Sequence, residues 1–221
     1  MLGSAFLEKL GLLTTDDADV ESEKLRKDRE ATAQRLLNDA YELARAGHHS
    51  AALIQLKEAL KNDSESAEVY QALGVTYLQL KEVKKAKSAF INALRIRPHY
   101  AEAHNDLGTI HDAEGNFLAA VKSYSQAIRF RSDSADYRNN LGLAYFNIGG
   151  YSEAIKIFQQ TLSMYPQDAR ALHGLALVYI DLDDKAAAME QQQILLESGE
   201  TEIAALVLDQ IQRHFWNQRY D

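Results

Sequence analysis

The chain has 221 residues, with 24 Lys and Arg against 32 Asp and Glu, which gives a formal net charge of −8. This acidic balance argues against general binding of nucleic acids, which requires a basic surface. Cysteine is absent, so disulfides and thiolate metal sites are excluded.

The beginning of the sequence bears on where in the cell the protein resides. It reads MLGSAFLEKLGLLTTDD, in which Glu8 and Lys9 interrupt the apolar run and no basic region precedes it, so it is a poor secretory signal. Leu2 stands where an N-myristoylation motif requires Gly. The sequence contains no apolar run of ~20 residues and therefore predicts no transmembrane span. We expect a cytoplasmic protein, although a processed precursor would read the same way.

Residues 1–32 form an N-terminal segment with two distinct patterns. Leu2, Phe6, Leu10 and Leu13 are three or four residues apart, which predicts a short amphipathic helix over 2–13. Isolated helices shorter than ~12–15 residues are marginal in water, so this helix must dock on something. Thr14 to Asp17 offer a break, and residues 21–30, ESEKLRKDRE, predict a charged, solvent-exposed helix leading into the next part of the chain.

From residue 33 to residue 202 the sequence repeats itself with a period of 34. The clearest unit, 67–100, carries Tyr70, Leu73, Gly74, Tyr77, Ala86, Phe90, Ala93 and Pro98. The pattern returns in 101–134 and 135–168, extends back to 33–66, and is degenerate in 169–202, where Gln192 replaces the aromatic residue. The twentieth position is always alanine: Ala52, Ala86, Ala120, Ala154 and Ala188. The eighth is always small: Ala40, Gly74, Gly108, Gly142 and Ala176. A fixed period of this length indicates a two-helix unit stacked on copies of itself, with small residues where helices approach closely.

These residues and spacings resemble the tetratricopeptide repeat (TPR) family. The resemblance implies an all-α fold, a right-handed superhelical solenoid of antiparallel helix pairs, with helix A over about the first fourteen positions of each unit and helix B over about the seventeenth to thirtieth. Gly47, Gly115 and Gly149 suit the left-handed residue that ends a helix, and Lys81 and Asp183 replace them in the second and fifth units. Ser66, Ser134 and Asp168 suit N-caps.

Residues 203–221 follow the last unit. Ile203, Leu206, Val207 and Ile211 predict a capping helix over about 200–215 with an apolar inner face. The aromatic tail, Phe215, Trp216 and Tyr220, either packs on this helix or anchors a partner.

The sequence offers little sign of catalysis. His104 and His111 are seven residues apart on one helix, or about 10 Å along its axis, which is too far for one metal ion, and they occupy packing positions of the repeat. Asp181, Asp183 and Asp184 lack the glycine and closing glutamate of a calcium loop. Phosphate loops, dinucleotide fingerprints and nucleophile elbows are absent. We therefore expect neither an enzyme nor a bound cofactor or metal.

Similarity to the TPR family also implies a concave groove lined by the A helices. Read onto this sequence, the groove residues that we expect to bind a ligand are Asn38, Tyr41, Asn105, Thr109, Asp112, Asn139, Asn140, Leu143, Phe146, Asn147, His173 and Leu177. The asparagines resemble those of superhelical TPR proteins in which amides hold the backbone of an extended peptide, because an amide both donates and accepts. The carboxylate clamp of co-chaperone TPR domains is not reproduced: its cations are missing, and Glu68, Glu102 and Asp136 stand at the second positions.

Three functions fit these features. The first is a protein–protein interaction adaptor that binds an extended peptide or partner segment in the groove. The second is a self-assembling scaffold in which residues 2–13 dock on a neighbouring subunit. The third is a peripheral membrane tether using the same stripe, which the absence of flanking Lys and Arg disfavours.

Overall fold

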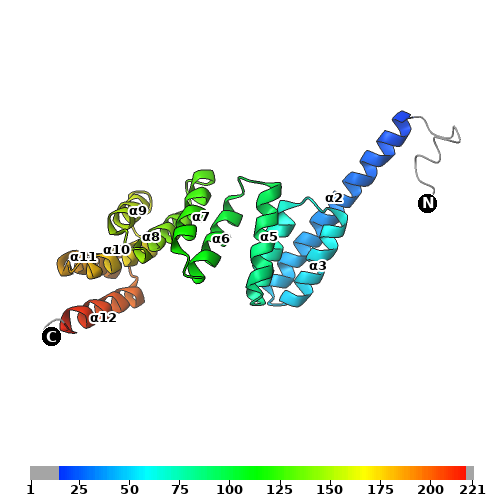
Figure 1. Ribbon diagram of the computed structural model, residues 1–221. Helices are drawn as coiled ribbons and strands as arrows, with labels where there is room; N and C mark the ends of the chain where they lie inside the picture. Colours follow the sequence, from blue (N-terminus) through cyan, green and yellow to red (C-terminus); the bar gives the residue numbers. More distant parts are fainter. Residues whose placement is uncertain (1–14, 218–221) are drawn as a thin grey trace. The chain divides into compact units, whose positions relative to one another are not determined.

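The computed structural model describes residues 15–217, which form α-helices joined by short turns and contain no strand (Figure 1). The chain divides into two compact units between Pro98 and His99. The first unit contains α2 (Thr15–Arg45), α3 (His49–Asn62), α4 (Ala67–Gln79) and α5 (Val83–Ile96). The second contains α6 (Ala101–Ala113), α7 (Phe117–Phe130), α8 (Ala135–Asn147), α9 (Tyr151–Met164), α10 (Ala169–Asp181), α11 (Lys185–Glu197) and α12 (Thr201–Asn217). The predicted all-α class is confirmed.

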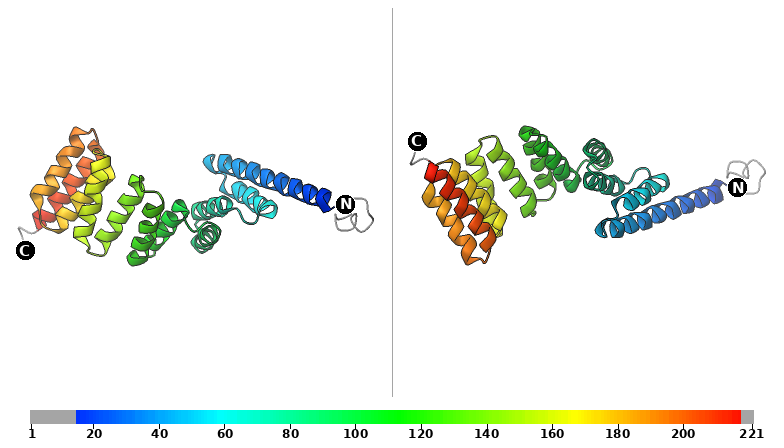
Figure 2. Two further views of the ribbon diagram at one scale, coloured as in Figure 1. Left: turned by 90° about the horizontal axis from the view of Figure 1, so that it is seen from above. Right: turned by 90° about the horizontal axis from the view of Figure 1, so that it is seen from below.

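The helices form consecutive antiparallel pairs, one for each 34-residue repeat. In the first unit, α2 packs on α3 and α4 packs on α5. In the second unit the pairs are α6 with α7, α8 with α9, and α10 with α11, and each later pair stacks on the one before it (Figures 1 and 2). The A helices are therefore α2, α4, α6, α8 and α10, and the B helices are α3, α5, α7, α9 and α11.

Helix α2 is longer than a repeat helix. It runs without interruption from Thr15 to Arg45, so the charged lead-in and the first helix A are one helix and no break occurs at residue 33. Its first half extends past the end of α3 (Figure 2). Residues 19–31 there are exposed, as the charged pattern predicts. The amphipathic stripe at 2–13 lies outside the described residues, so its role in docking stays a prediction.

Each pair turns through the same hydrogen-bonded cap. The amide after the left-handed residue donates to a carbonyl five residues earlier, as Glu82 does to Tyr77 at 2.8 Å. The corresponding donors, 34 residues apart, are His48, Glu82, Asn116, Gly150 and Asp184. Gly47, Gly115 and Gly149 have positive φ as predicted, and Lys81 and Asp183 adopt the same conformation with φ of 61° and 59°. A Schellman-type turn thus forms even where the sequence supplies no glycine.

In the three middle repeats, the glycine at the eighth position receives an aromatic ring from helix B: Phe90 at Gly74, Tyr124 at Gly108 and Phe158 at Gly142. A Cβ added to Gly142 would lie 2.6 Å from Cε1 of Phe158, and one added to Gly174, at the sixth position of the next unit, would lie 2.3 Å from Cζ of the same ring. Phe158 is thus enclosed by two glycines from successive A helices and is fully buried. The alanines at the twentieth position are all 0% exposed: Ala52, Ala86, Ala120, Ala154 and Ala188. Close helix contact accounts for both small positions.

Helix α12 caps the last repeat. Ala204, Val207 and Ile211 are buried in one cluster with residues of α10 and α11, among them Leu172 and Leu195. This confirms the predicted apolar inner face, and the helix extends two residues beyond the predicted end. Phe215 packs against the same cluster. The tail residue Tyr220 and the side chain of Trp216 lie outside what the structure describes.

Candidate functional site

A ladder of polar side chains crosses the three A helices of the second unit. Asn140 on α8 donates through Nδ2 to Oδ1 of Asn105 on α6, at 2.9 Å. Arg170 on α10 donates through Nη2 to Oδ1 of Asn140, at 2.8 Å. We call Asn105, Asn140 and Arg170 the amide ladder. It ties together α6, α8 and α10, whose residues become neighbours only because the repeat has a period close to 34.

A second polar contact lies two turns further along the same helices. Asn147 donates through Nδ2 to Oδ1 of Asp112, at 3.4 Å. Each partner is seven residues after its counterpart in the ladder, and seven residues rise about 10 Å along a helix. The two rungs, one of Asn105 and Asn140 and one of Asp112 and Asn147, therefore make one polar face across α6 and α8.

Apolar and hydroxyl side chains complete this face. Leu143 and Phe146 lie within one turn of the rung residues of α8, are half-buried, and pack against a core cluster formed by their own repeat and the following one. Thr109 on α6 is exposed, and its hydroxyl accepts a hydrogen bond from Tyr124 at 3.4 Å while donating to the carbonyl of Asn105 at 3.3 Å. Burial raises the pKa of the Tyr124 hydroxyl, which keeps it protonated as that donor.

Asn139 does not belong to this face, which corrects the expectation from the sequence. Its side chain is 0% exposed, and its Nδ2 donates to Oδ1 of Asp168 at 2.7 Å. The same carboxylate oxygen accepts from the backbone amide of Ala171 at 2.8 Å and so caps α10. Asn139 therefore joins α8 to the start of α10, and a ligand cannot reach it. Of the two adjacent asparagines, only Asn140 is partly exposed.

The C-terminal end of the face is covered in part by the capping helix. Nε2 of His173 on α10 lies 3.3 Å from Oε1 of Gln210 on α12. Burial lowers the pKa of His173, and the contact with Gln210 opposes this only in part. Leu177, one turn further on, is half-buried. His173 thus serves to dock α12, a role that the repeat pattern does not predict, because α12 follows the last repeat.

The remaining predicted groove residues belong to the first unit. Asn38 is exposed and accepts a hydrogen bond from Gln34 at 3.1 Å. Tyr41 on α2 is 39% exposed and lines a cleft of about 380 Å³ with Val75 of α4, which is 37% exposed. His49, at the start of α3, also lines this cleft, and its Nδ1 is buried with no hydrogen-bond partner among residues 15–217. The groove positions of α2 and α4 therefore meet at an apolar cleft, in contrast to the polar face of the second unit.

Sequence reasoning missed the arginines that pair with the acids at the second positions. Glu68 pairs with Arg97 and Glu102 with Arg131, at the same spacing one repeat apart. Asp136 pairs instead with Arg170, at 2.8 Å. Arg170 itself occupies the second position of the fifth 34-residue repeat, where the earlier repeats have an acid. This change from acid to base at the second position is the sequence signal for the pair of Arg170 with Asp136.

Residues 15–217 contain no cluster of three or more His, Cys, Asp or Glu side chains suited to a metal ion. His104 instead stacks on Phe130, with ring centroids 5.5 Å apart, and Nε2 of His214 lies 2.8 Å from Oδ1 of Asp183. Between Thr15 and Asn217, no helix combines the length and apolar character needed to cross a membrane.

Comparison with known families agrees with this architecture. Profiles described as tetratricopeptide repeat match residues 67–100 and 139–203, and one described as TPR repeat matches residues 112–149. The chain belongs to the tetratricopeptide repeat family. Its members are built from the helix pairs seen here, so the TPR assignment and the fold support each other.

Solved structures of other TPR proteins share the fold. The crystal structure of MamA is 25% identical, with a TM-score of 0.67, and covers 74% of this chain and 95% of its own. YrrB, described as a TPR protein with an unusual peptide-binding site, is 22% identical, with a TM-score of 0.68 over 85% of this chain and 96% of its own. PilF of Pseudomonas aeruginosa is 17% identical, with a TM-score of 0.73, over 87% of this chain and 88% of its own. No curated protein sequence matches the chain.

Proposed function

We propose that this TPR protein is an interaction adaptor that binds an extended segment of a partner protein on the α6–α8–α10 face. The amide ladder is the observation that carries the proposal. A primary amide has two N–H groups and two acceptor lone pairs on oxygen, and a guanidinium has five N–H groups. The bonds within the ladder use one N–H of Asn140 and one of Arg170, and a second N–H of Arg170 bonds to Asp136, which leaves donors for peptide carbonyls.

The ladder also prepares the site for binding. Asn105, Asn140 and Arg170 are already held in one arrangement by their mutual hydrogen bonds. A partner would therefore not bear the cost of ordering them, which is about 0.5–1.5 kcal/mol for each flexible side chain. The two rungs are separated by about 10 Å along the helices, a distance that three residues of an extended peptide also span. Leu143 and Phe146 offer a contact for an apolar side chain between the rungs.

The fold supports this use. YrrB, which has a similar fold, is described as having a peptide-binding site, so a TPR array of this size can accommodate a peptide. We propose that the ligand of the present chain is held mainly through its backbone, because amides recognise peptide groups with little regard to sequence.

The proposal is tested by the double variant Asn105→Ala/Asn140→Ala. The partner is first captured from an extract of the native host, identified, and purified, and its affinity is then measured by calorimetry. Each neutral hydrogen bond contributes about 0.5–1.5 kcal/mol, so the double variant should bind about tenfold more weakly or worse. A matched control, Gln159→Ala/Gln160→Ala, removes two exposed amides from α9 and should leave the affinity unchanged. Equal affinities in both variants would place the partner elsewhere on the protein.

A further inference from the structure

A second groove lies in the first unit, on the opposite side of α4 from the cleft of Tyr41. The cleft is lined by Val75 and Gln79, whereas the second groove is lined by Leu73 and Tyr77. Residues two apart on a helix are separated by about 200°, so these pairs project to opposite sides. The groove has a volume of about 440 Å³ and lies between α3, α4 and α5. It is separate from the α6–α8–α10 face.

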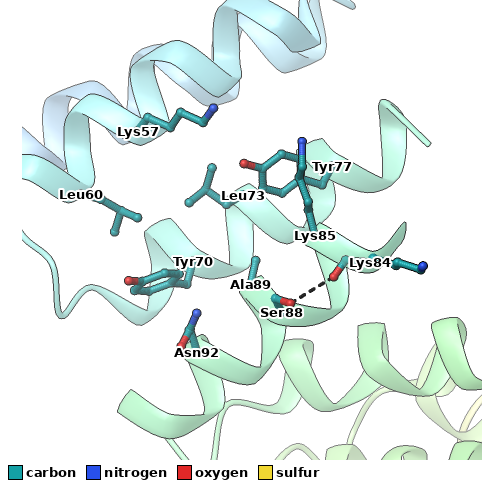
Figure 3. Close-up of a pocket in the computed structure, with 10 residues that line it drawn as sticks. All are labelled: Lys57, Leu60, Tyr70, Leu73, Tyr77, Lys84, Lys85, Ser88, Ala89 and Asn92. Carbon is teal, nitrogen blue, oxygen red and sulfur yellow. Dashed lines mark hydrogen bonds between the residues drawn. The ribbon is translucent and has the colours of Figure 1, made fainter. Parts of the chain in front are cut away.

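The floor of this groove is apolar. Leu60 of α3 and Leu73 of α4 point toward each other across it, with Tyr70 beside them (Figure 3). Leu73 is 4% exposed, whereas Leu60 and Tyr70 are half-buried, so part of their apolar surface stays in contact with solvent. Such a floor has room for large apolar side chains from a ligand.

The rim of the groove is basic. Lys57 stands on the α3 side and Lys85 on the α5 side, with Leu73 between them (Figure 3). The Lys57 ammonium group has no ion partner among the described residues. Lys85 pairs with Glu82, and its Nζ lies 5.6 Å from the centroid of the Tyr77 ring. Lys84 also lines the groove, but its side chain extends away from Leu73 (Figure 3).

The position of these lysines on α5 adds to the positive potential. Lys84 and Lys85 lie in the first turn of α5, which contains no acidic residue. The N-terminus of a helix carries a partial positive charge, so lysines there do not stabilise the helix and instead reinforce its attraction for anions. Glu82, at the N-cap, makes no side-chain capping bond, and its carboxylate, which pairs with Lys85, offsets part of this potential.

The charge of the whole chain is distributed unevenly. Residues 1–98 contain 15 Lys and Arg against 15 Asp and Glu, whereas residues 99–221 contain 9 against 17. The net charge of −8 therefore comes from the second unit, and the lysines of the groove are a local concentration on a unit with no net charge. Charge complementarity with an acidic ligand is a property of this groove.

We propose that the groove of α3, α4 and α5 binds a short segment of a partner protein in which large apolar residues stand next to Asp or Glu. The apolar side chains lie on Leu60, Tyr70 and Leu73, and the carboxylates pair with Lys57 and Lys85. This gives the protein a second binding surface besides the amide ladder, so that one chain can join two partners.

The probe for this proposal is a library of random 12-residue peptides displayed on phage and selected on the full-length protein, with the variant Lys57→Glu/Lys85→Glu used for counter-selection. Enriched peptides should combine Asp or Glu with Leu, Ile or Phe. Their affinities are then measured as synthetic peptides by fluorescence polarisation. Reversing two lysines replaces attraction by repulsion, so the double variant should bind at least about tenfold more weakly. Serine in place of the apolar peptide residues should also abolish binding.

Two control variants test whether a loss of peptide binding is specific to this groove. Lys122→Glu/Lys156→Glu changes the net charge equally, at exposed lysines of the second unit, and should bind normally. Asn105→Ala/Asn140→Ala should also bind normally, so that failure at the ladder and failure at this groove are distinguished. Peptides without an acidic bias, or unchanged affinity in Lys57→Glu/Lys85→Glu, would overturn the proposal. So would a dimer of the full-length protein that the same variant dissociates, because a second copy would then occupy the groove.

Discussion

Asn139 and Asn140 are adjacent in the sequence, and the structure assigns them opposite roles. Asn139 is fully buried and donates to Asp168, whereas Asn140 is half-exposed in the amide ladder. Replacing Asn139 by alanine removes a hydrogen bond to a carboxylate, worth about 1.5–3 kcal/mol. It also removes Oδ1, which is buried without a hydrogen-bond partner in the described part of the chain, and this relieves part of the loss. We expect Asn139→Ala to lower the free energy of unfolding by about 2 kcal/mol.

The same substitution at Asn140 should barely affect stability. Its bonds to Asn105 and Arg170 lie at a partly solvated surface, where water replaces them, so we expect a loss below about 1 kcal/mol. Partner affinity should follow the opposite order. The Asn140→Ala variant should bind the partner more weakly, whereas the Asn139→Ala variant should bind with unchanged affinity as long as it is folded. For a chain of this size, 2 kcal/mol corresponds to a fall in Tm of roughly 4–8 °C.

Thermal unfolding followed by circular dichroism measures both variants against the wild type. Asn139→Asp adds a stricter comparison, because it keeps the shape of the side chain but places a second carboxylate against Asp168. We expect it to be less stable than Asn139→Ala at neutral pH. Equal Tm values for Asn139→Ala and the wild type, or a larger loss in Asn140→Ala, would refute the assignment of buried and exposed roles.

Three further predictions follow from the turns, the cap and the groove. Lys81→Gly should raise the free energy of unfolding by about 1 kcal/mol in urea, because a left-handed residue with a side chain is strained; lower stability would show that the side chain contributes more than the strain costs. Since the folded-state pKa of His173 is lowered, its stabilising effect is present above the unfolded pKa of about 6.5 and is lost as the pH falls. His173→Gln should therefore reduce the fall in Tm between pH 7.5 and pH 5, and an unchanged fall would count against this. A peptide ending in Glu-Glu-Val-Asp should bind no better than a scrambled control in fluorescence polarisation, because the cations of the carboxylate clamp are missing and Glu68, Glu102 and Asp136 stand at the second positions; saturable binding lost on C-terminal amidation would contradict it.

The regular part of the fold is predictable from the sequence because each unit repeats the same local contacts. A small residue at the eighth position and an aromatic ring from helix B specify the packing within a pair, as Gly142 and Phe158 do. The left-handed turns are predictable where glycine marks them. At Lys81 and Asp183 the packing of the flanking helices imposes the same turn on residues that disfavour it.

The site was less predictable because it depends on contacts between successive repeats. Which of the two asparagines is buried depends on Asp168, 29 residues after Asn139, and the role of Arg170 depends on Asp136 in the preceding repeat. The long α2 was divided in the prediction because the change from charged to repetitive sequence at residue 33 is not a change in helix propensity. The basic groove was missed because its lysines come from two different B helices, α3 and α5.

Site-specific photo-crosslinking tests most directly whether a partner occupies the α6–α8–α10 face. A benzoylphenylalanine at Thr109, which is exposed on that face, is compared with one at Leu118, which is 72% exposed on the B helix α7. We predict that the purified partner crosslinks to position 109, that unlabelled partner competes with this crosslink, and that position 118 gives none. Crosslinking from position 118 alone would contradict binding on this face.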